Sequence, residues 1–293
     1  MSLKARHLTF FLLCFLIGIS ASFIFYEPRD DFHYANPNWN GFSSLVGEFD
    51  ARIVGVDIDH NSLLSNSSHY ALIIVPMVEP SSDYLTFLKT FVASGGLLII
   101  ADDKGYGNMI LESFGLDARF DHEGVLYDPV FFWKKAELAY VFADVDGEKV
   151  EVLTNYASII NCKNCSPLLV SSRLSFFDAD LDGVWEKGEI EGPHVIAAST
   201  EYENGCIVLV ADPDIFTNFS IQESKSLEFV RRVIGERLLV LDESLNRHSS
   251  YAVLRMNFLS FLAALYRWRE VFIITLSFIS LLLLVYIVKW WKK

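Results

Sequence analysis

Apolar residues gather in two long uncharged runs at the ends of the chain, and in short blocks between them. The first run covers residues 8–26 and the second covers residues 271–288. At a helical rise of about 1.5 Å per residue, each run approaches the roughly 30 Å thickness of a bilayer core. The pattern predicts two transmembrane helices, one within 1–26 and one within 271–293.

The first run also fits a second interpretation. A basic start, an apolar middle and the small residues Ser20, Ala21 and Ser22 describe a cleavable signal peptide as well as an uncleaved anchor. The second run ends in two Trp and three Lys, as a span leaving the membrane does. The basic flanks of both runs predict cytoplasmic termini in a cell membrane, with residues 27–270 extracytoplasmic.

Between the runs, the hydrophobic pattern alternates between strands and helices. Continuous apolar blocks predict strands at 52–58, 70–75, 97–101, 206–211 and 237–241, and helical spacing predicts helices at 81–93, 107–114 and 223–234. This alternation indicates a parallel α/β sheet. Shorter, amphipathic strands at 150–153, 168–177 and 194–199 indicate a β-rich insertion at about 120–200. We expect an α/β domain over 27–248 and a juxtamembrane helix over 249–270.

Charge is distributed unevenly along the chain. The formal net charge is −13, but residues 27–270 hold all 37 acidic residues and 19 of the 24 basic ones, which gives that region −18. This acidity argues against nucleic acid as a partner, because such proteins need a basic surface. It favours cations or basic partners outside the cell.

A twelve-residue acidic segment, 178–189, matches the spacing of an EF-hand calcium loop. The expected ligands are the side chains of Asp178, Asp180, Asp182 and Glu189 and the main-chain carbonyl of Val184. The flanks look like strands rather than helices. We therefore expect a structural Ca²⁺ staple, and the alternative is an acidic hairpin loop without a metal.

Polar residues also follow three of the predicted parallel strands. If those strands are parallel, these residues meet at the carboxyl edge of the sheet, where ligands bind in doubly wound folds. We call this set the acidic rim: Asp102, Asp103, Asp212, Asp214, Asn218, Asp242 and Glu243. Such an edge suits a cation, a polyol or a basic peptide. The alternative is that each Asp simply caps the helix that follows it.

Cys162 and Cys165 form a CxxC pair that is followed by Ser166-Pro167 and a predicted strand. A thioredoxin-type site needs this motif at the start of a helix. We expect a local disulfide across a turn, or two free thiols, rather than a catalytic pair. The chain also lacks a G-x-S-x-G or G-x-C-x-G nucleophile elbow.

Four phrases taken in order, 70–76, 91–103, 178–193 and 208–218, resemble the family called domain of unknown function 4350, over roughly residues 40–245. The resemblance implies a membrane-anchored relative of the class I glutamine amidotransferase fold, which is a flavodoxin-like α/β domain. The amidotransferase cysteine has no counterpart, since Cys206 falls at the start of a predicted strand. The resemblance therefore implies no enzymatic reaction for this chain.

Two functions are compatible with these features. The first is a membrane-anchored extracytoplasmic binding or scaffolding domain without catalytic activity, with the lipid bilayer and membrane or extracytoplasmic proteins as partners. The second is a metal-assisted hydrolase or peptidase that uses the acidic rim.

Overall fold

The computed structural model describes residues 3–145 and 147–267. The chain divides into two units, Pro28–Arg247 and the pair of terminal segments. Among the described residues, no helix combines the length and the apolar character needed to span a membrane. The predicted C-terminal span, 271–288, lies outside the described residues.

The terminal unit contains two helices, α1 Leu3–Phe25 and α8 Ser250–Arg267. They contact each other through Arg255, whose Nε donates to the Phe23 carbonyl at 3.0 Å. The Arg255 guanidinium also pairs with the Glu27 carboxylate at 2.9 Å. Phe23 packs against Tyr251 with the ring centroids 5.6 Å apart.

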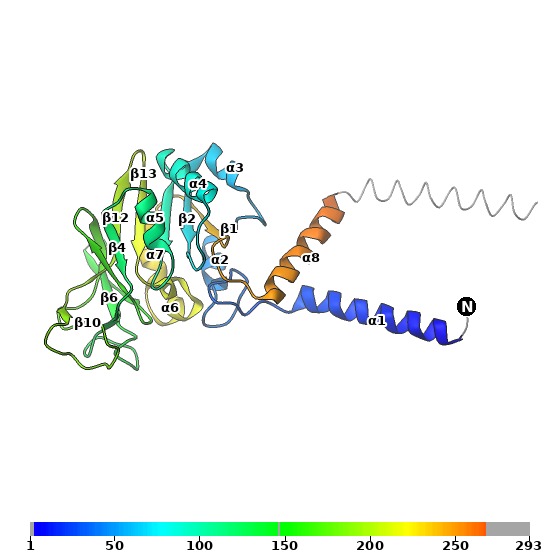
Figure 1. Cartoon of the computed structure of the whole chain (residues 1–293), viewed down its shortest axis with the longest axis horizontal. Helices are drawn as coiled ribbons and strands as arrows, with labels where there is room; N and C mark the ends of the chain where they lie inside the picture. The colour runs from blue at the N-terminus through cyan, green and yellow to red at the C-terminus, as the bar shows by residue number, and fades with distance from the viewer. Residues whose placement is uncertain (1–2, 146, 268–293) are drawn as a thin grey trace, which may run out of the picture. The chain divides into compact units, whose positions relative to one another are not determined.

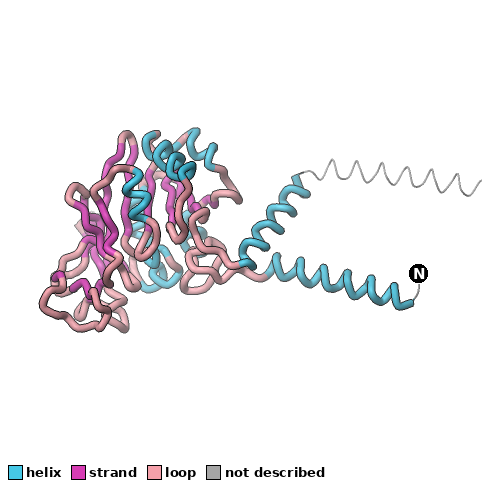
Figure 2. The backbone as a smooth tube through the Cα atoms, viewed as in Figure 1, coloured by secondary structure: helices cyan, strands magenta, loops and turns pink. Residues whose placement is uncertain are grey.

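The larger unit alternates helices and strands along the chain (Figures 1 and 2). Its first part contains α2 Ser43–Phe49, β1 Arg52–Ile53, α3 His60–Ser65, β2 Tyr70–Ile74, α4 Ser82–Ala93, β3 Leu97–Ala101 and α5 Gly107–Ser113. Its middle contains β4 Ala118–Asp121, β5 Val125–Tyr127, β6 Tyr140–Val145, β7 Glu148–Leu153, β8 Ile159–Cys162, β9 Ser166–Val170, β10 Phe176–Asp178, β11 Ile190–Glu191 and β12 Val195–Tyr202. Its last part contains β13 Gly205–Val210, α6 Asn218–Glu223, α7 Ser226–Ile234 and β14 Leu238–Asp242, and short 3₁₀ turns occupy Ser67–His69 and Pro213–Phe216.

The main sheet has the strand order β1-β14-β2-β3-β13-β12-β9-β6-β7. The pairs β1–β14, β14–β2, β2–β3 and β3–β13 are parallel. Every residue of β3 is buried, and only Tyr70 of β2 is partly exposed. This burial is the reason why these strands read as continuous apolar blocks. The α/β class predicted from the sequence is confirmed.

The β-rich middle extends this sheet. Strands β12, β9, β6 and β7 continue it with antiparallel pairing. Two smaller sheets, β11-β10-β5 and β4-β8, complete the region. The predicted insertion is therefore present, and much of it forms the antiparallel half of one mixed sheet.

Three predicted elements are shorter or divided. The 52–58 strand ends at Ile53, because Gly55 adopts a positive φ of 80° and Ile53 O accepts a turn hydrogen bond from Asp57 N at 2.9 Å. The 168–177 strand is interrupted at 171–175 by a turn that separates β9 from β10. The 223–234 helix begins at Ser226, because Ser224 is extended and ends α6.

The hairpin between β12 and β13 packs closely on the end of α4. A Cβ added at Gly205 would lie 2.2 Å from Val92 O and 2.5 Å from Gly96 O. Glycine is therefore required where this hairpin crosses the chain between α4 and β3.

Candidate functional site

The parallel strands bring the predicted acidic rim to one edge of the main sheet. Strands β14, β3 and β13 end at Asp242, Ala101 and Val210, and the carboxylates of the acidic rim lie at or just beyond these ends. Because β2 lies between β14 and β3, the rim has two parts. One part follows β3 and β13, and the other follows β14.

In the first part of the rim, both carboxylate oxygens of Asp102 accept hydrogen bonds from nearby main-chain N–H groups. It is 2% exposed, and its Oδ2 accepts from Gly107 N at 2.7 Å while its Oδ1 accepts from Gly105 N. These contacts hold the turn that leads into α5, whose N-cap residue is Tyr106. His122 Nε2 lies 3.3 Å from Asp102 Oδ2, and this pairing raises the pKa of His122.

Asp212 is likewise anchored by main-chain donors. It is fully buried, its Oδ1 accepts from Asp214 N at 2.9 Å, and its Oδ2 accepts from Asn155 N at 2.7 Å. Burial, together with the neighbouring Asp214 charge, raises the pKa of Asp212 well above its usual range. The Asn155 side chain donates to Asp214 Oδ2 at 3.2 Å, so one asparagine joins both carboxylates.

Asp103 and Asp214 are the partly exposed carboxylates of this part. Burial, and then the charges of Asp103 and Asp31, raise the pKa of Asp214 to about 7. Burial and the Asp102 charge also raise the pKa of Asp103. Carboxyl groups crowded in this way resist ionisation, because each negative charge raises the free energy of the next. Among the described residues, neither Asp103 nor Asp214 forms an ion pair.

The second part of the rim is a buried polar cluster at the end of β14. Asp242 accepts from His60 Nε2 at 2.7 Å and from the Tyr84 hydroxyl at 2.8 Å, and Ser244 donates to it as well. Burial alone would raise the pKa of Asp242, but these hydrogen bonds outweigh it and hold the pKa below its usual value. Burial raises the pKa of Glu243 to about 8, although Tyr34 N donates to its carboxyl group.

Asn218 is a buried residue whose side chain forms hydrogen bonds with main-chain groups of a distant segment. It is 2% exposed, its Nδ2 donates to Asn36 O at 3.0 Å and to Asn38 O at 2.6 Å, and its Oδ1 accepts from Ser44 N at 2.7 Å. These contacts tie α6 to the lead-in segment before α2. The amide is thus occupied by main-chain groups 174–182 residues away in the sequence.

Sequence reasoning missed His60 and Asn155. Each contacts the acidic rim from a segment far from it in the sequence, at separations of 182 and 57 residues. A lone His after Asp59 and an Asn after β7 carry no local motif that would mark them. Only the folded sheet brings them to this edge.

The predicted calcium-type loop, residues 178–189, connects β10 to β11. Oxygen atoms of Asp178, Asp180 and Asp182 lie within 4.8 Å of one another, which is a spacing that a metal ion can bridge. Asp178 is buried and the other two are exposed. The flanking strands pair in antiparallel register, Phe176 with Glu191 and Phe177 with Ile190. The predicted strand-like flanks are therefore present.

The last residue of the loop folds back over it. Glu189 Oε1 accepts from Ala179 N at 3.3 Å, and Glu189 Oε2 accepts from Glu186 N at 3.0 Å. Val184 N donates to Asp182 Oδ1 at 2.7 Å, while the Val184 side chain is 61% exposed. The side chains of the predicted ligands thus already serve as acceptors within the loop.

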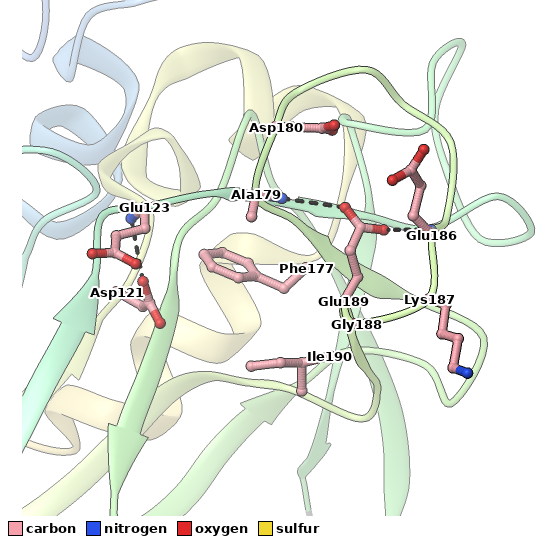
Figure 3. A pocket seen from close by; sticks show the side chains of 10 residues that line it. All are labelled: Asp121, Glu123, Phe177, Ala179, Asp180, Glu186, Lys187, Gly188, Glu189 and Ile190. Atoms are coloured by element: carbon pink, nitrogen blue, oxygen red, sulfur yellow. Dashed lines mark hydrogen bonds between the residues drawn. The ribbon is translucent and has the colours of Figure 1, made fainter.

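A hollow of about 350 Å³ adjoins this loop (Figure 3). Figure 3 shows Asp121 and Glu123 on one side, facing the ring of Phe177 and the carboxylate of Glu189. Ile190 lies at its base and is 55% exposed. The hollow therefore combines acidic walls with an apolar floor.

Cys162 and Cys165 form a disulfide between β8 and β9. Cys206 is a free thiol at the second position of β13, and burial raises the pKa of its sulfur. A thiol of this kind is poorly suited to act as a nucleophile.

The comparisons with known proteins establish the family. The chain belongs to the family described as domain of unknown function (DUF4350), whose model matches residues 34–234. Its fold is an α/β fold with a mixed sheet, in which β1, β14, β2, β3 and β13 are parallel. None of the curated proteins compared with this chain matches it.

Solved structures with a similar arrangement include two proteins of different kinds. The mmIFT52 N-terminal domain is 12% identical with a TM-score of 0.45, and the match covers 66% of this chain and 83% of that one. Gan42B, a GH42 β-galactosidase from G. stearothermophilus, is 16% identical with a TM-score of 0.34. That match covers 66% of this chain but only 26% of the galactosidase.

Proposed function

We propose that this chain is a membrane-anchored extracytoplasmic binding or scaffolding domain without catalytic activity, and that its acidic rim receives a cationic group from a partner in a membrane-associated assembly. The observation that carries this proposal is the position of Asp103 and Asp214, two partly exposed carboxylates just beyond the carboxyl ends of β3 and β13. Burial and the charges of Asp103 and Asp31 raise the pKa of Asp214 to about 7. Negative charge is thus crowded at an edge where ligands bind in doubly wound sheets. A cationic group placed there would offset the mutual repulsion and favour the ionised carboxylates.

The hydrogen bonds of the rim favour binding over catalysis. Asp102, Asp212 and Asp242 are buried, and their oxygens already accept hydrogen bonds from other groups of the chain, namely Gly107 N, Asn155 N and His60 Nε2. Among the described residues, the part of the rim that follows β3 and β13 does not supply three ligand atoms within 4.8 Å of one another, whereas the 178–189 loop does. This part of the rim therefore suits a charged side chain of a partner better than a metal ion.

The proposed membrane attachment rests on the two uncharged runs in the sequence. Lys4 and Arg6 precede the first run and three Lys residues follow the second, which favours cytoplasmic termini. Protease digestion of intact spheroplasts should leave a C-terminal tag protected and degrade residues 27–270. Digestion of the tag from outside would contradict this topology.

We further propose that the 178–189 loop binds Ca²⁺ as a structural staple. The close carboxylates of Asp178, Asp180 and Asp182 support this, as does the antiparallel pairing of β10 with β11 on either side. Hard oxygen ligands in a flexible loop suit Ca²⁺. The bound ion would fix the loop to the small sheet, without an EF-hand helix pair that could open.

One observation favours the alternative of a hydrolase or peptidase. A carboxyl group with a pKa of about 7, such as that of Asp214, is well placed for general acid–base chemistry near neutral pH. Alanine variants at Asp102, Asp103, Asp212 and Asp214 separate the two functions. A binding domain loses its partner without any associated turnover, whereas a hydrolase loses a measurable reaction.

The direct test of the proposed function is a titration of the purified full-length chain with a tetralysine peptide, comparing wild type with Asp103→Asn/Asp214→Asn. We expect the double variant to bind the peptide more weakly. Equal affinity would show that the rim is not the binding edge.

A further inference from the structure

A second hollow lies beside the β12–β13 hairpin, at the amino ends of β13 and β14, whereas the acidic rim lies at the carboxyl ends of these strands. Its volume is about 650 Å³, within the range of small-molecule sites. Its lining is mostly polar, and the residues that matter here are Asn164, Ser199, Glu201, Glu203, Cys206 and Arg237.

Arg237 is the exceptional member of this lining. It lies between α7 and β14, where its main-chain N–H donates to Ile234 O at 3.3 Å. Its guanidinium makes no hydrogen bond or ion pair with any other described residue, and its Nε is buried without an acceptor. The Nε is closed to solvent, but the Arg237 side chain as a whole is partly exposed. An acceptor from outside the chain would therefore reach the terminal N–H groups of the guanidinium, which can donate to a carboxylate.

Two carboxylates accompany this cation. Glu201 pairs with Cys206 across the β12–β13 ladder, and Glu203 lies in the turn that joins the two strands. Arg237 and Glu201 both lie close enough to the Cys206 thiol to act on its pKa in opposite directions, although burial has the larger effect. One positive and one negative group of this lining therefore lie near the same thiol.

We propose that this hollow binds a small zwitterion, namely a basic amino acid, whose carboxylate pairs with Arg237 and whose ammonium groups face Glu201 and Glu203. A guanidinium matches a carboxylate in a bidentate geometry. One Arg and two Glu also balance the one carboxylate and two ammonium groups of lysine. The Asn164 amide and the Ser199 hydroxyl supply further polar contacts within the same lining.

Cys206 provides a reporter that is already in the chain. The test alkylates full-length protein in detergent with N-ethylmaleimide and follows the Cys206 and Cys14 peptides by mass spectrometry. We expect L-lysine at about 10 mM, enough to fill a site of millimolar Kd, to slow alkylation of Cys206 at least fivefold and to leave Cys14 unchanged. Cadaverine, which lacks the carboxylate, and hexanoate, which lacks the ammonium groups, should each give less than a twofold effect.

Substitutions then test which charged side chain of the hollow binds which charged group of lysine. Arg237→Gln should weaken lysine binding, measured by calorimetry, at least tenfold, while Arg173→Gln at an exposed arginine should leave it unchanged. Glu201→Gln, at an exposed position, tests the ammonium contact without a buried change and should also weaken binding.

The inference is overturned by absence of protection in wild type, by equal protection from cadaverine or hexanoate, or by unchanged affinity in Arg237→Gln or Glu201→Gln. Because this hollow and the acidic rim lie at opposite edges of the sheet, failure here leaves the rim proposal standing, and the reverse also holds.

Discussion

Asp178 Oδ2 accepts a hydrogen bond from Gly183 N at 2.8 Å, so the first and sixth residues of the calcium-type loop are held together. Gly183 adopts a positive φ of 77°, and a Cβ there would lie 3.1 Å from the Tyr127 hydroxyl. This turn places the Asp180 and Asp182 side chains beside Asp178. This turn therefore defines the part of the loop on which the three carboxylates converge.

The first prediction concerns calcium. Adding Ca²⁺ at about 10 mM should raise the melting temperature of the full-length chain, with a stabilisation of about 1–3 kcal/mol if the Kd is on the order of 0.1–1 mM. Asp180→Asn/Asp182→Asn should abolish the increase, because it removes two of the three converging carboxylates. Glu191→Gln, just beyond the loop, is the matched control and should retain it. No change in the wild-type melting temperature, by differential scanning calorimetry, would rule out the staple.

The second prediction concerns the pH dependence of stability. The pKa of Asp214 is raised in the folded state, so the folded chain binds this proton more tightly than the unfolded chain does. Its favourable contribution is therefore fully present below about pH 4 and is lost as the pH rises towards and through 7.

Asp214→Asn mimics the protonated carboxyl group and should remove this loss. We expect the variant to be more stable than wild type at pH 8, by an amount on the order of 2 kcal/mol, and to show little or no gain at pH 4. Urea unfolding at the two pH values measures the difference. A variant that is destabilised equally at both would mean that the Asp214 carboxylate is satisfied when ionised.

The third prediction concerns the framework around the rim. Asn218→Ala removes hydrogen bonds to Asn36 O, Asn38 O and Ser44 N, and it leaves buried main-chain groups without partners. The expected loss of stability is about 2–4 kcal/mol. Thr86→Ala is a suitable control, because its hydroxyl makes a single exposed contact to Ser82 O. Equal losses in urea unfolding would show that Asn218 has no special structural role.

The parallel half of the sheet was predictable because its signal is local. Buried strands on both faces produce uninterrupted apolar blocks, and 97–101 matches β3 at both ends. The helix predicted at 81–93 is present as α4, and the hydroxyl of its N-cap residue, Ser81, accepts from Tyr84 N at 3.2 Å. Each of these features depends on neighbours within a few residues.

The residues that contact the rim carboxylates were less predictable, because they come from distant parts of the sequence. Positions after parallel strands indicate which carboxylates share an edge, but not that Tyr84 and His60 surround Asp242 or that Asn155 joins Asp212 to Asp214. The lead-in before α2 depends on a distant contact in the same way. Its order comes from Asn218, far along the chain.

The central claim is that the rim carboxylates Asp103 and Asp214 receive a cationic group. The most direct measurement is calorimetric titration of the full-length chain with tetralysine at low salt and pH 8, where the Asp214 carboxyl group, with a pKa of about 7, is largely ionised. Asp117→Asn/Glu236→Gln removes two exposed carboxylates elsewhere and serves as the matched control. We predict that Asp103→Asn/Asp214→Asn weakens binding about tenfold, that the control changes it less than about twofold, and that wild-type affinity falls at pH 6. Equal weakening in both double variants, or no binding by wild type, would contradict the proposal.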